Sequence, residues 1–183
     1  MSRYRPPRPK SSPHMTQEGF DTLQAELKYL WKVKRPEVTA KVSEAAAQGD
    51  RSENAEYIYG KKQLREIDGR VRYLSKRLDN AEVITRLPSE TDRVFFGAWV
   101  TVTNESTNAQ HPGEPLHLRI VGSDEAGTQT GYISIDSPMA RALLGKRCDD
   151  EIEVTGPEGT ALYCIDHLSY TAPPGECHEQ QDG

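Results

Sequence analysis

The sequence has few cysteines and no long apolar run. Its three cysteines, Cys148, Cys164 and Cys177, are odd in number and form no CxxC pair, so we expect no disulfide framework and a reducing, cytoplasmic environment. No stretch approaches the roughly 18–20 apolar residues of a membrane span. The basic N-terminus lacks the apolar core of a secretory signal. We therefore expect a cytoplasmic protein with no membrane partner.

Apolar residues are also scarce for a chain of 183 residues. Hydrophobic residues make up 35% and aromatic residues 7%, with a mean hydropathy of −0.74. This composition is too polar for one large globule, so it favours a thin, elongated element or disordered ends. Residues 1–89 hold 18 Lys and Arg against 12 Asp and Glu, whereas residues 90–183 hold 5 against 16. The basic half suits nucleic acid, and the acidic half suits a protein partner.

The hydrophobic spacing predicts an N-terminal helical hairpin. Apolar residues recur every three or four positions from Phe20 to Leu30 and again from Val38 to Ala45, with a kink expected near Pro36. Gly49 ends this run. A second apolar stripe with heptad spacing follows, with Gly60 at one of its positions. The pattern indicates an antiparallel coiled coil with arms of roughly 30 residues, about 45 Å long.

From about residue 93 the apolar spacing changes to two, which is typical of strands. We expect strands at 94–103, 116–122, 131–136, 151–155 and 161–170, and a short helix at 139–146 capped by Ser137. The fold class is therefore α+β, a coiled-coil hairpin followed by a small antiparallel-sheet domain with one short helix. The predicted organisation is a disordered basic, Pro-rich tail at 1–14, the hairpin at 15–86, the sheet domain at 92–172 and a flexible tail at 173–183.

The turn between the helices, QGDRSEN at residues 48–54, holds two acids three residues apart. One interpretation is helix capping, in which Asp50 and Glu53 form a capping box or Ser52 is the cap. The other is a metal site at the end of a thin rod. Magnesium commonly takes only one or two protein carboxylates together with water and phosphate oxygens. Two acids hold Mg²⁺ poorly alone, but they can complete a site elsewhere that lacks ligands.

The second helix carries seven cations and four anions between residues 55 and 80. The excess favours a weak surface for phosphates. An ordinary solvated face, with Glu66, Asp68 and Asp79 as ion-pair partners, is the alternative. Lys62, Arg65, Arg72 and Lys76 share one face of the predicted helix.

Several segments in a fixed order resemble the Gre family of bacterial transcript cleavage factors. They are RPEV (35–38), GDRSENAEY (49–57), KKQLREIDGRVRYL (61–74), FFGAWV (95–100) and YISIDSPMARALLGK (132–146). The resemblance covers about residues 16–170. The basic N-terminal extension, the 104–115 loop and the tail with Cys177 and His178 depart from the family pattern.

The resemblance implies that the sheet domain is FKBP-like and that the coiled coil enters the secondary channel of bacterial RNA polymerase. The polymerase, not this chain, would cleave the RNA 3′ end of a backtracked complex, so the chain is not itself an enzyme. No cofactor would be bound stably, since Mg²⁺ would be shared with the polymerase active centre, and we expect a monomer. By similarity, the catalytic and metal-binding residues are Asp50 and Glu53, the RNA contacts are Lys61, Lys62, Arg65 and Arg72, and the polymerase-docking residues are Asp136, Ser137, Pro138 and Met139.

Three other functions compete with this reading. A non-catalytic regulator of the same channel would be marked by an altered tip, yet both acids are present. A peptidyl-prolyl isomerase rests on fold analogy alone, and the sheet region has few aromatic residues to line a proline pocket. A scaffold would use the tip acids only as helix caps. For Ser137 and Pro138, simple capping of the short helix is an equal alternative to docking.

Overall fold

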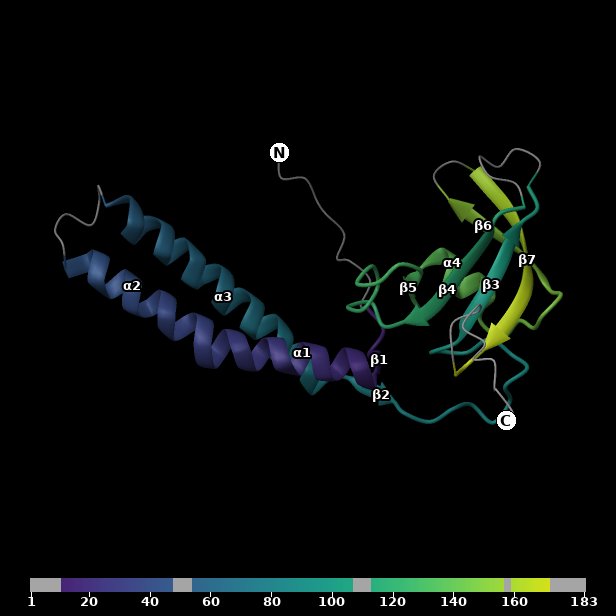
Figure 1. The fold of residues 1–183 in the computed structure, drawn as a ribbon, viewed down its shortest axis with the longest axis horizontal. Helices are drawn as coiled ribbons and strands as arrows, with labels where there is room; N and C mark the ends of the chain where they lie inside the picture. Colours follow the sequence, from purple (N-terminus) through teal and green to yellow (C-terminus); the bar gives the residue numbers. More distant parts are fainter. Residues whose placement is uncertain (1–10, 48–53, 107–112, 157–158, 172–183) are drawn as a thin grey trace, which may run out of the picture. The chain divides into compact units, whose positions relative to one another are not determined.

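The computed structural model describes residues 11–47, 54–106, 113–156 and 159–171. The chain divides into two units, the helical segment Gln17–Glu82 and a unit formed by the chain before and after it. Figure 1 shows the elements of each unit. The helical elements are α1 (Gln17–Tyr29), η1 (Leu30–Lys34), α2 (Arg35–Ala47), α3 (Ala55–Asp79) and α4 (Pro138–Leu143); the strands are β1 (His14–Thr16), β2 (Glu82–Ile84), β3 (Trp99–Asn104), β4 (Pro115–Val121), β5 (Tyr132–Ser134), β6 (Glu151–Gly156) and β7 (Gly159–Ser169).

The helical unit is the hairpin that the sequence predicts. One arm consists of α1, η1 and α2, and α3 returns beside it (Figure 1). With 25 residues, α3 is about 38 Å long. Its buried positions are Gly60, Ile67 and Leu74, seven residues apart as a coiled-coil seam requires. The prediction of a coiled-coil hairpin is therefore confirmed.

Close packing and ion pairs fix how the two arms align. A Cβ atom built on Gly60 would lie 2.4 Å from Cγ2 of Val42, so only glycine lets α2 and α3 approach this closely. Arg70 on α3 forms a two-pronged ion pair with Glu26 on α1, with both N–O distances at 2.8 Å. Arg35 reaches Asp68 across the arms, also at 2.8 Å. Such paired geometry favours one register of the arms.

The first arm contains a π-helical turn that the sequence analysis missed. The N–H of Arg35 donates to the carbonyl of Leu30, a separation of five residues, and the turn spans Leu30–Lys34. Pro36 lies two residues after the end of this turn, as the second residue of α2. Proline lacks an N–H and its ring crowds the carbonyl four residues earlier. Where the sequence predicts a kink near Pro36, the structure therefore has a wider turn just before it.

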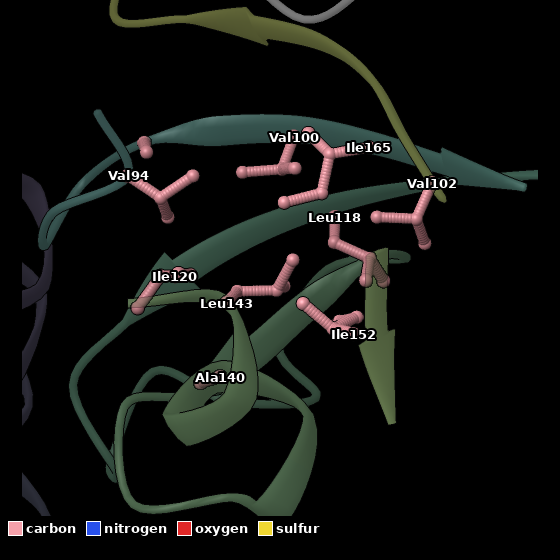
Figure 2. Packing of buried hydrophobic residues seen from close by; sticks show 10 residues of the cluster. Val94, Val100, Val102, Leu118, Ile120, Ala140, Leu143, Ile152 and Ile165 are labelled. Atoms are coloured by element: carbon pink, nitrogen blue, oxygen red, sulfur yellow. The ribbon is translucent and has the colours of Figure 1, made fainter. Parts of the chain in front are cut away.

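The sheet domain has five strands in the order β5-β4-β3-β7-β6. Every neighbouring pair is antiparallel except β4 and β5, which run parallel. The helix α4 supplies Ala140 and Leu143 to the core, and Figure 2 shows these side chains beside apolar residues of the strands. The buried core comprises Val94, Ala98, Val100, Val102, Leu118, Ile120, Ala140, Leu143, Ile152 and Ile165.

The predicted strand at 94–103 is wrong in its first half. The strand β3 starts only at Trp99, because Gly97 has a φ of +86° and Ala98 donates to the carbonyl of Phe95 in a turn. A left-handed glycine of this kind interrupts an extended strand. The turn still carries core residues, since Val94 and Ala98 are fully buried.

Tyr170, just after β7, ties the end of the sheet to this turn. Its hydroxyl donates to the carbonyl of Arg93 and accepts from the N–H of Phe95 at 2.9 Å. Burial raises the pKa of Tyr170, the charge of Asp92 raises it further, and the Phe95 N–H opposes both effects. The neutral hydroxyl is thus the form that the fold favours.

The N-terminal segment is part of the sheet-domain unit. Residues 11–14, which the sequence analysis assigns to a disordered tail, are described here, and His14–Thr16 form β1, which pairs with β2. Met15 is fully buried. Thr16 lies directly before α1. Its hydroxyl and its backbone N–H both donate to the carboxylate of Glu125, the N–H at 3.0 Å. The prediction that residues 11–14 belong to a disordered tail is therefore wrong.

Candidate functional site

The described end of the hairpin is held by one side chain, that of Asn54. Its Oδ1 accepts the N–H of Tyr57 at 3.1 Å, which makes Asn54 the N-cap of α3. Its Nδ2 donates to the carbonyl of Ala45 at 3.0 Å, near the end of α2 where carbonyls lack partners within the helix. One amide thus pairs with one backbone group in the first turn of α3 and one in the last turn of α2.

This arrangement corrects the capping interpretation of the turn. In that interpretation Asp50 and Glu53, or Ser52, cap the second helix, but α3 begins at Ala55 and its N-cap is Asn54. Asp50, Ser52 and Glu53 lie in residues 48–53, outside the described residues. The sequence signal for Asn54 was available, because asparagine is a preferred N-cap residue directly before a helical run.

Two apolar side chains near this end of the hairpin face solvent. Ile58 is 54% exposed and Tyr59 is 69% exposed. The sequence analysis overlooked them because they fall outside the apolar stripe of α3.

The predicted RNA-contact residues lie together along α3. Lys61, Lys62, Arg65 and Arg72 are all exposed. The ammonium group of Lys61 lies 5.5 Å from the ring centroid of Tyr57. Within the described residues, no carboxylate forms an ion pair with any of these four side chains.

The solvated-face alternative for these cations loses one of its expected partners. Asp68 pairs with Arg35 of the other arm rather than with a cation of its own helix. Arg70, which is not among the four, pairs with Glu26. The arms therefore use Arg35 and Arg70 for their own alignment, while the four predicted contacts remain exposed.

The predicted docking residues sit where β5 leads into α4. Ser137 is the N-cap of α4, since its Oγ accepts the N–H of Ala140 at 3.1 Å, and Pro138 occupies the first turn. The capping alternative for these two residues is thus confirmed. Pro138 is exposed, whereas Met139 packs against the core. Met139 is therefore only partly available to a partner.

Asp136 has a partner that the sequence did not reveal. Its Oδ2 accepts the backbone N–H of Ser12 at 2.9 Å, across 124 residues of sequence. Its own N–H donates to Oγ of Ser134 at 3.1 Å. No local pattern signals such a contact, because it depends on how the N-terminal segment crosses the sheet domain.

Two of the aromatic residues of the sheet, Trp99 and Tyr132, have a cation between their rings. The guanidinium of Arg119 lies between two rings, 5.1 Å from the centroid of Trp99 and 5.2 Å from that of Tyr132. Its Nη1 donates to the Tyr132 hydroxyl at 2.5 Å. The three residues are in register on neighbouring strands. A cation occupies the place between the rings, which counts against the isomerase alternative.

Metal-ligand clusters and membrane spans can be assessed for the part of the chain that the structure describes. In residues 11–47, 54–106, 113–156 and 159–171, no group of three or more His, Cys, Asp or Glu is placed to hold a metal ion. Among the same residues, no helix has both the length and the apolar character to cross a membrane.

Comparison with known proteins assigns most of the chain to one family. The family model described as "Transcription elongation factor, N-terminal" matches residues 14–83, and "Transcription elongation factor, GreA/GreB, C-term" matches residues 88–170. These matches correspond to the hairpin and the sheet domain, and they define a transcription elongation factor of the Gre type. The transcription elongation factor GreB of Pseudomonas aeruginosa is 55% identical over 174 residues, which is 95% of this chain and 100% of the relative. The chain belongs to the GreA/GreB family.

Further relatives agree with this assignment. The GreB of Pasteurella multocida is 53% identical over 159 residues, covering 87% of this chain and 97% of the relative. The segments LWKVKRPEV and FFGAWV and the basic second helix also resemble GreB more than GreA. The family prediction made from the sequence is thus confirmed.

Two solved structures are similar at lower identity. The GreA/GreB factor from Nitrosomonas europaea is 22% identical, covers 89% of this chain and 100% of its own, and has a TM-score of 0.38. The GreA factor homolog 1 of Thermus thermophilus is 23% identical, covers 85% and 97%, and also has a TM-score of 0.38.

Proposed function

We propose that this protein inserts the end of its coiled coil into the secondary channel of bacterial RNA polymerase. There it stimulates the Mg²⁺-dependent cleavage of the RNA 3′ end in backtracked, arrested complexes, so that elongation resumes. The polymerase breaks the RNA phosphodiester bond, and this chain contributes side chains to the active site of the polymerase. The second candidate is a regulator that occupies the channel without stimulating cleavage.

The observation that carries the proposal is the assignment of the α3 cap to Asn54. Asn54 accepts the Tyr57 N–H and donates to the Ala45 carbonyl, so the N-cap position of α3 belongs to a residue other than the two acids. Asp50 and Glu53 belong to the seven residues, 48–54, that connect α2 and α3. A hairpin only two helices thick can bring this connection into a passage too narrow for a globular domain.

The donor set fits a shared magnesium site. Mg²⁺ prefers oxygen ligands and commonly takes one or two protein carboxylates, which Asp50 and Glu53 provide. When bound, the ion supplies Lewis-acid stabilisation of the phosphate and lowers the pKa of a bound water. Asp50 and Glu53 would each offer carboxylate oxygens toward the ion, and either can orient a water molecule by accepting its hydrogen bond.

The exposed cations of α3 support a role beside RNA. Lys61, Lys62, Arg65 and Arg72 present four positive charges on the arm that follows the acids, and phosphate binding by such side chains weakens as salt rises. Cross-linking of this face to the RNA 3′ segment should therefore decrease with added salt. Lys62→Gln with Arg65→Gln should weaken it, whereas Lys41→Gln on the other arm serves as the control. Cross-linking that does not respond to salt would favour an ordinary solvated face.

Docking is assigned to the segment from Asp136 to Met139. Pro138 is exposed and Asp136, just before α4, is half-buried. Both residues belong to the unit that contains the acidic half of the sequence. We expect Asp136 to pair with a cationic surface at the channel mouth, while Ser137 and Met139 keep α4 in place.

The experiment that tests the function uses a deliberately backtracked bacterial elongation complex with RNA labelled at its 3′ end. Addition of the protein with Mg²⁺ should release short 3′ fragments and restore elongation when nucleotides follow. Binding without fragment release would support the non-catalytic channel regulator. No binding to the polymerase would remove both candidates.

A further inference from the structure

A tryptophan in the π-helical turn of the first arm faces solvent. Trp31 lies in η1 and is 54% exposed, whereas tryptophan is highly buried on average. The packed seam of the hairpin uses other residues of the arm, such as Leu23 and Val38, which are both buried. π-helical turns within α-helices occur frequently at functional sites. The exposed ring is therefore a candidate contact for a ligand.

The sequence around Trp31 is basic. The segment KYLWKVKR, residues 28–35, has four cations and no acid. Lys28 and Lys32 are exposed, and Lys28 lies three positions before Trp31, on the neighbouring part of the helix surface. Among the residues that the structure describes, no carboxylate forms an ion pair with Lys28 or Lys32. Proteins bind single-stranded nucleic acid with this combination, because phosphates pair with the cations and bases stack on the aromatic ring.

Arg35 joins Trp31 to the cationic face of α3. Its guanidinium carbon lies 5.3 Å from the centroid of the Trp31 ring, and its Nε donates to Oδ1 of Asp68 at 2.8 Å. Asp68 comes three residues after Arg65 and four before Arg72, so these three residues share one face of α3. Trp31 thus lies on the same side of the hairpin as residues to which RNA contact is assigned.

Arg35 also holds the Trp31 ring in place. The guanidinium lies over one face of the indole, and the bond to Asp68 fixes its position. A ring that is already held loses little conformational freedom when a ligand binds. The other face of the indole is left for a flat partner, and every nucleic-acid base has a flat aromatic face. The arrangement suits a base stacked on the side of the indole opposite Arg35.

The position of Trp31 along the hairpin determines which RNA reaches it. The arm between Trp31 and Ala45, close to the described end of the hairpin, is about 21 Å long. Stacked nucleotides advance by about 3.4 Å each along a strand, so about six nucleotides span this length. RNA extruded past the end of the hairpin by fewer nucleotides would reach the cations near Lys61 but not Trp31.

We propose that the RNA-contact face of α3 continues onto the first arm, where Trp31 stacks on a base of the extruded single-stranded RNA and Lys28 and Lys32 pair with its phosphates. This inference rests on the proposed function and deepens it. It names a base-stacking residue, and it limits the contact to RNA that has been extruded far enough to reach the π-helical turn.

Three substitutions test the ring itself. Trp31→Ala removes the stacking surface, and Trp31→Phe keeps a smaller one. Tyr29→Ala is the matched control, because Tyr29 is also an exposed aromatic residue of this arm, at 51%, but lies two positions away, where side chains do not share a face of the helix. Both positions are exposed, so all three variants should unfold near the Tm of the parent.

The readout is the Kd of each labelled full-length protein for two backtracked elongation complexes, with about two and about ten extruded nucleotides, below and above the span of about six. Trp31→Ala should bind the long complex about five- to tenfold more weakly than the parent, the loss expected for one base on an aromatic ring, and should bind the short complex like the parent. Trp31→Phe should lose less, and Tyr29→Ala should lose nothing. Unchanged binding of Trp31→Ala to the long complex would overturn the stacking role. An equal loss with both complexes would show that Trp31 contacts the polymerase, and it would overturn the role as well.

The phosphate contacts have a separate signature in salt. Lys28→Gln with Lys32→Gln should weaken binding to the long complex and reduce its salt dependence, because fewer counterions are released. Lys41→Gln is the control, since Lys41 is an exposed cation of the same arm that lies beside Tyr59 and Gln63 instead. A salt dependence equal to that of the parent would overturn the phosphate contacts.

Failure of the proposed function is distinguished by fragment release. If the parent binds both complexes but releases no RNA fragments, the cleavage role fails, and the Kd values still decide the stacking role. If the parent binds neither complex, both proposals are overturned.

Discussion

Asn54 should contribute strongly to the stability of the hairpin, because its side chain bonds to both arms. Asn54→Ala removes the acceptor for the Tyr57 N–H and the donor to the Ala45 carbonyl. Loss of an N-cap costs about 1 kcal/mol, and loss of one side-chain hydrogen bond costs about another 1 kcal/mol. The expected decrease in the free energy of unfolding is therefore about 2 kcal/mol.

Asn54→Asp separates the two contributions. Aspartate keeps an N-cap acceptor and suits the positive end of α3. It cannot donate to the Ala45 carbonyl, and its charge is unfavourable beside the negative end of α2. We expect a loss of about 1 kcal/mol, half that of Asn54→Ala.

Thermal unfolding followed by far-ultraviolet circular dichroism measures both variants, because most of the described helix lies in α1, α2 and α3. For a unit of this size, 2 kcal/mol corresponds to a decrease in Tm of about 8–16 °C. An unchanged Tm for Asn54→Ala would refute the reasoning. Equal losses for the two variants would show that the bond to Ala45 alone, and not the cap, holds the hairpin end.

Two further perturbations have opposite or pH-dependent effects. Gly60→Ala should destabilise the hairpin by about 1–3 kcal/mol, because its Cβ would lie 2.4 Å from Val42. Gly69→Ala should stabilise the hairpin by about 0.5–1 kcal/mol, because nothing lies within 4 Å of its Cβ. Denaturant titration compares the two variants, and a Gly60→Ala protein as stable as the parent would contradict the close packing. Because burial raises the pKa of Tyr170 in the folded state, its share of stability is complete below the unfolded pKa near 10 and is lost as pH rises through the folded pKa. Tyr170→Phe should therefore lower stability at neutral pH and flatten its decline at alkaline pH; an unchanged alkaline slope in urea titrations would argue against this role.

The features that the sequence predicted are those with a repeated pattern. Apolar residues three or four positions apart located the first arm of the hairpin, and heptad spacing located the second and placed Gly60 in the seam, where a Cβ would lie 2.4 Å from Val42. Alternating residues located most strands, and Ser137 with Pro138 marked the start of α4. Each of these signals is local, so that neighbouring residues suffice to read it.

The features that the sequence analysis missed depend on contacts between distant residues. The bond from Ser12 to Asp136 spans 124 residues, and β5 runs parallel to β4, which the spacing of apolar residues cannot reveal. The π-helical turn accommodates Pro36, whose ring crowds the carbonyl four residues earlier, within a longer helical arm. The Asn54 cap was readable, but the acids of the same turn fitted a capping pattern equally well.

The central claim is that Asp50 and Glu53 supply carboxylates to a shared magnesium site. The most direct test measures the rate of 3′-fragment release from a backtracked complex over a range of Mg²⁺ concentrations, with the parent, Asp50→Asn and Glu53→Gln at saturating protein. The account predicts that each variant folds and binds like the parent, stimulates cleavage far less, and recovers part of the loss at high Mg²⁺. Equal stimulation by the parent and both variants at every Mg²⁺ concentration would contradict it.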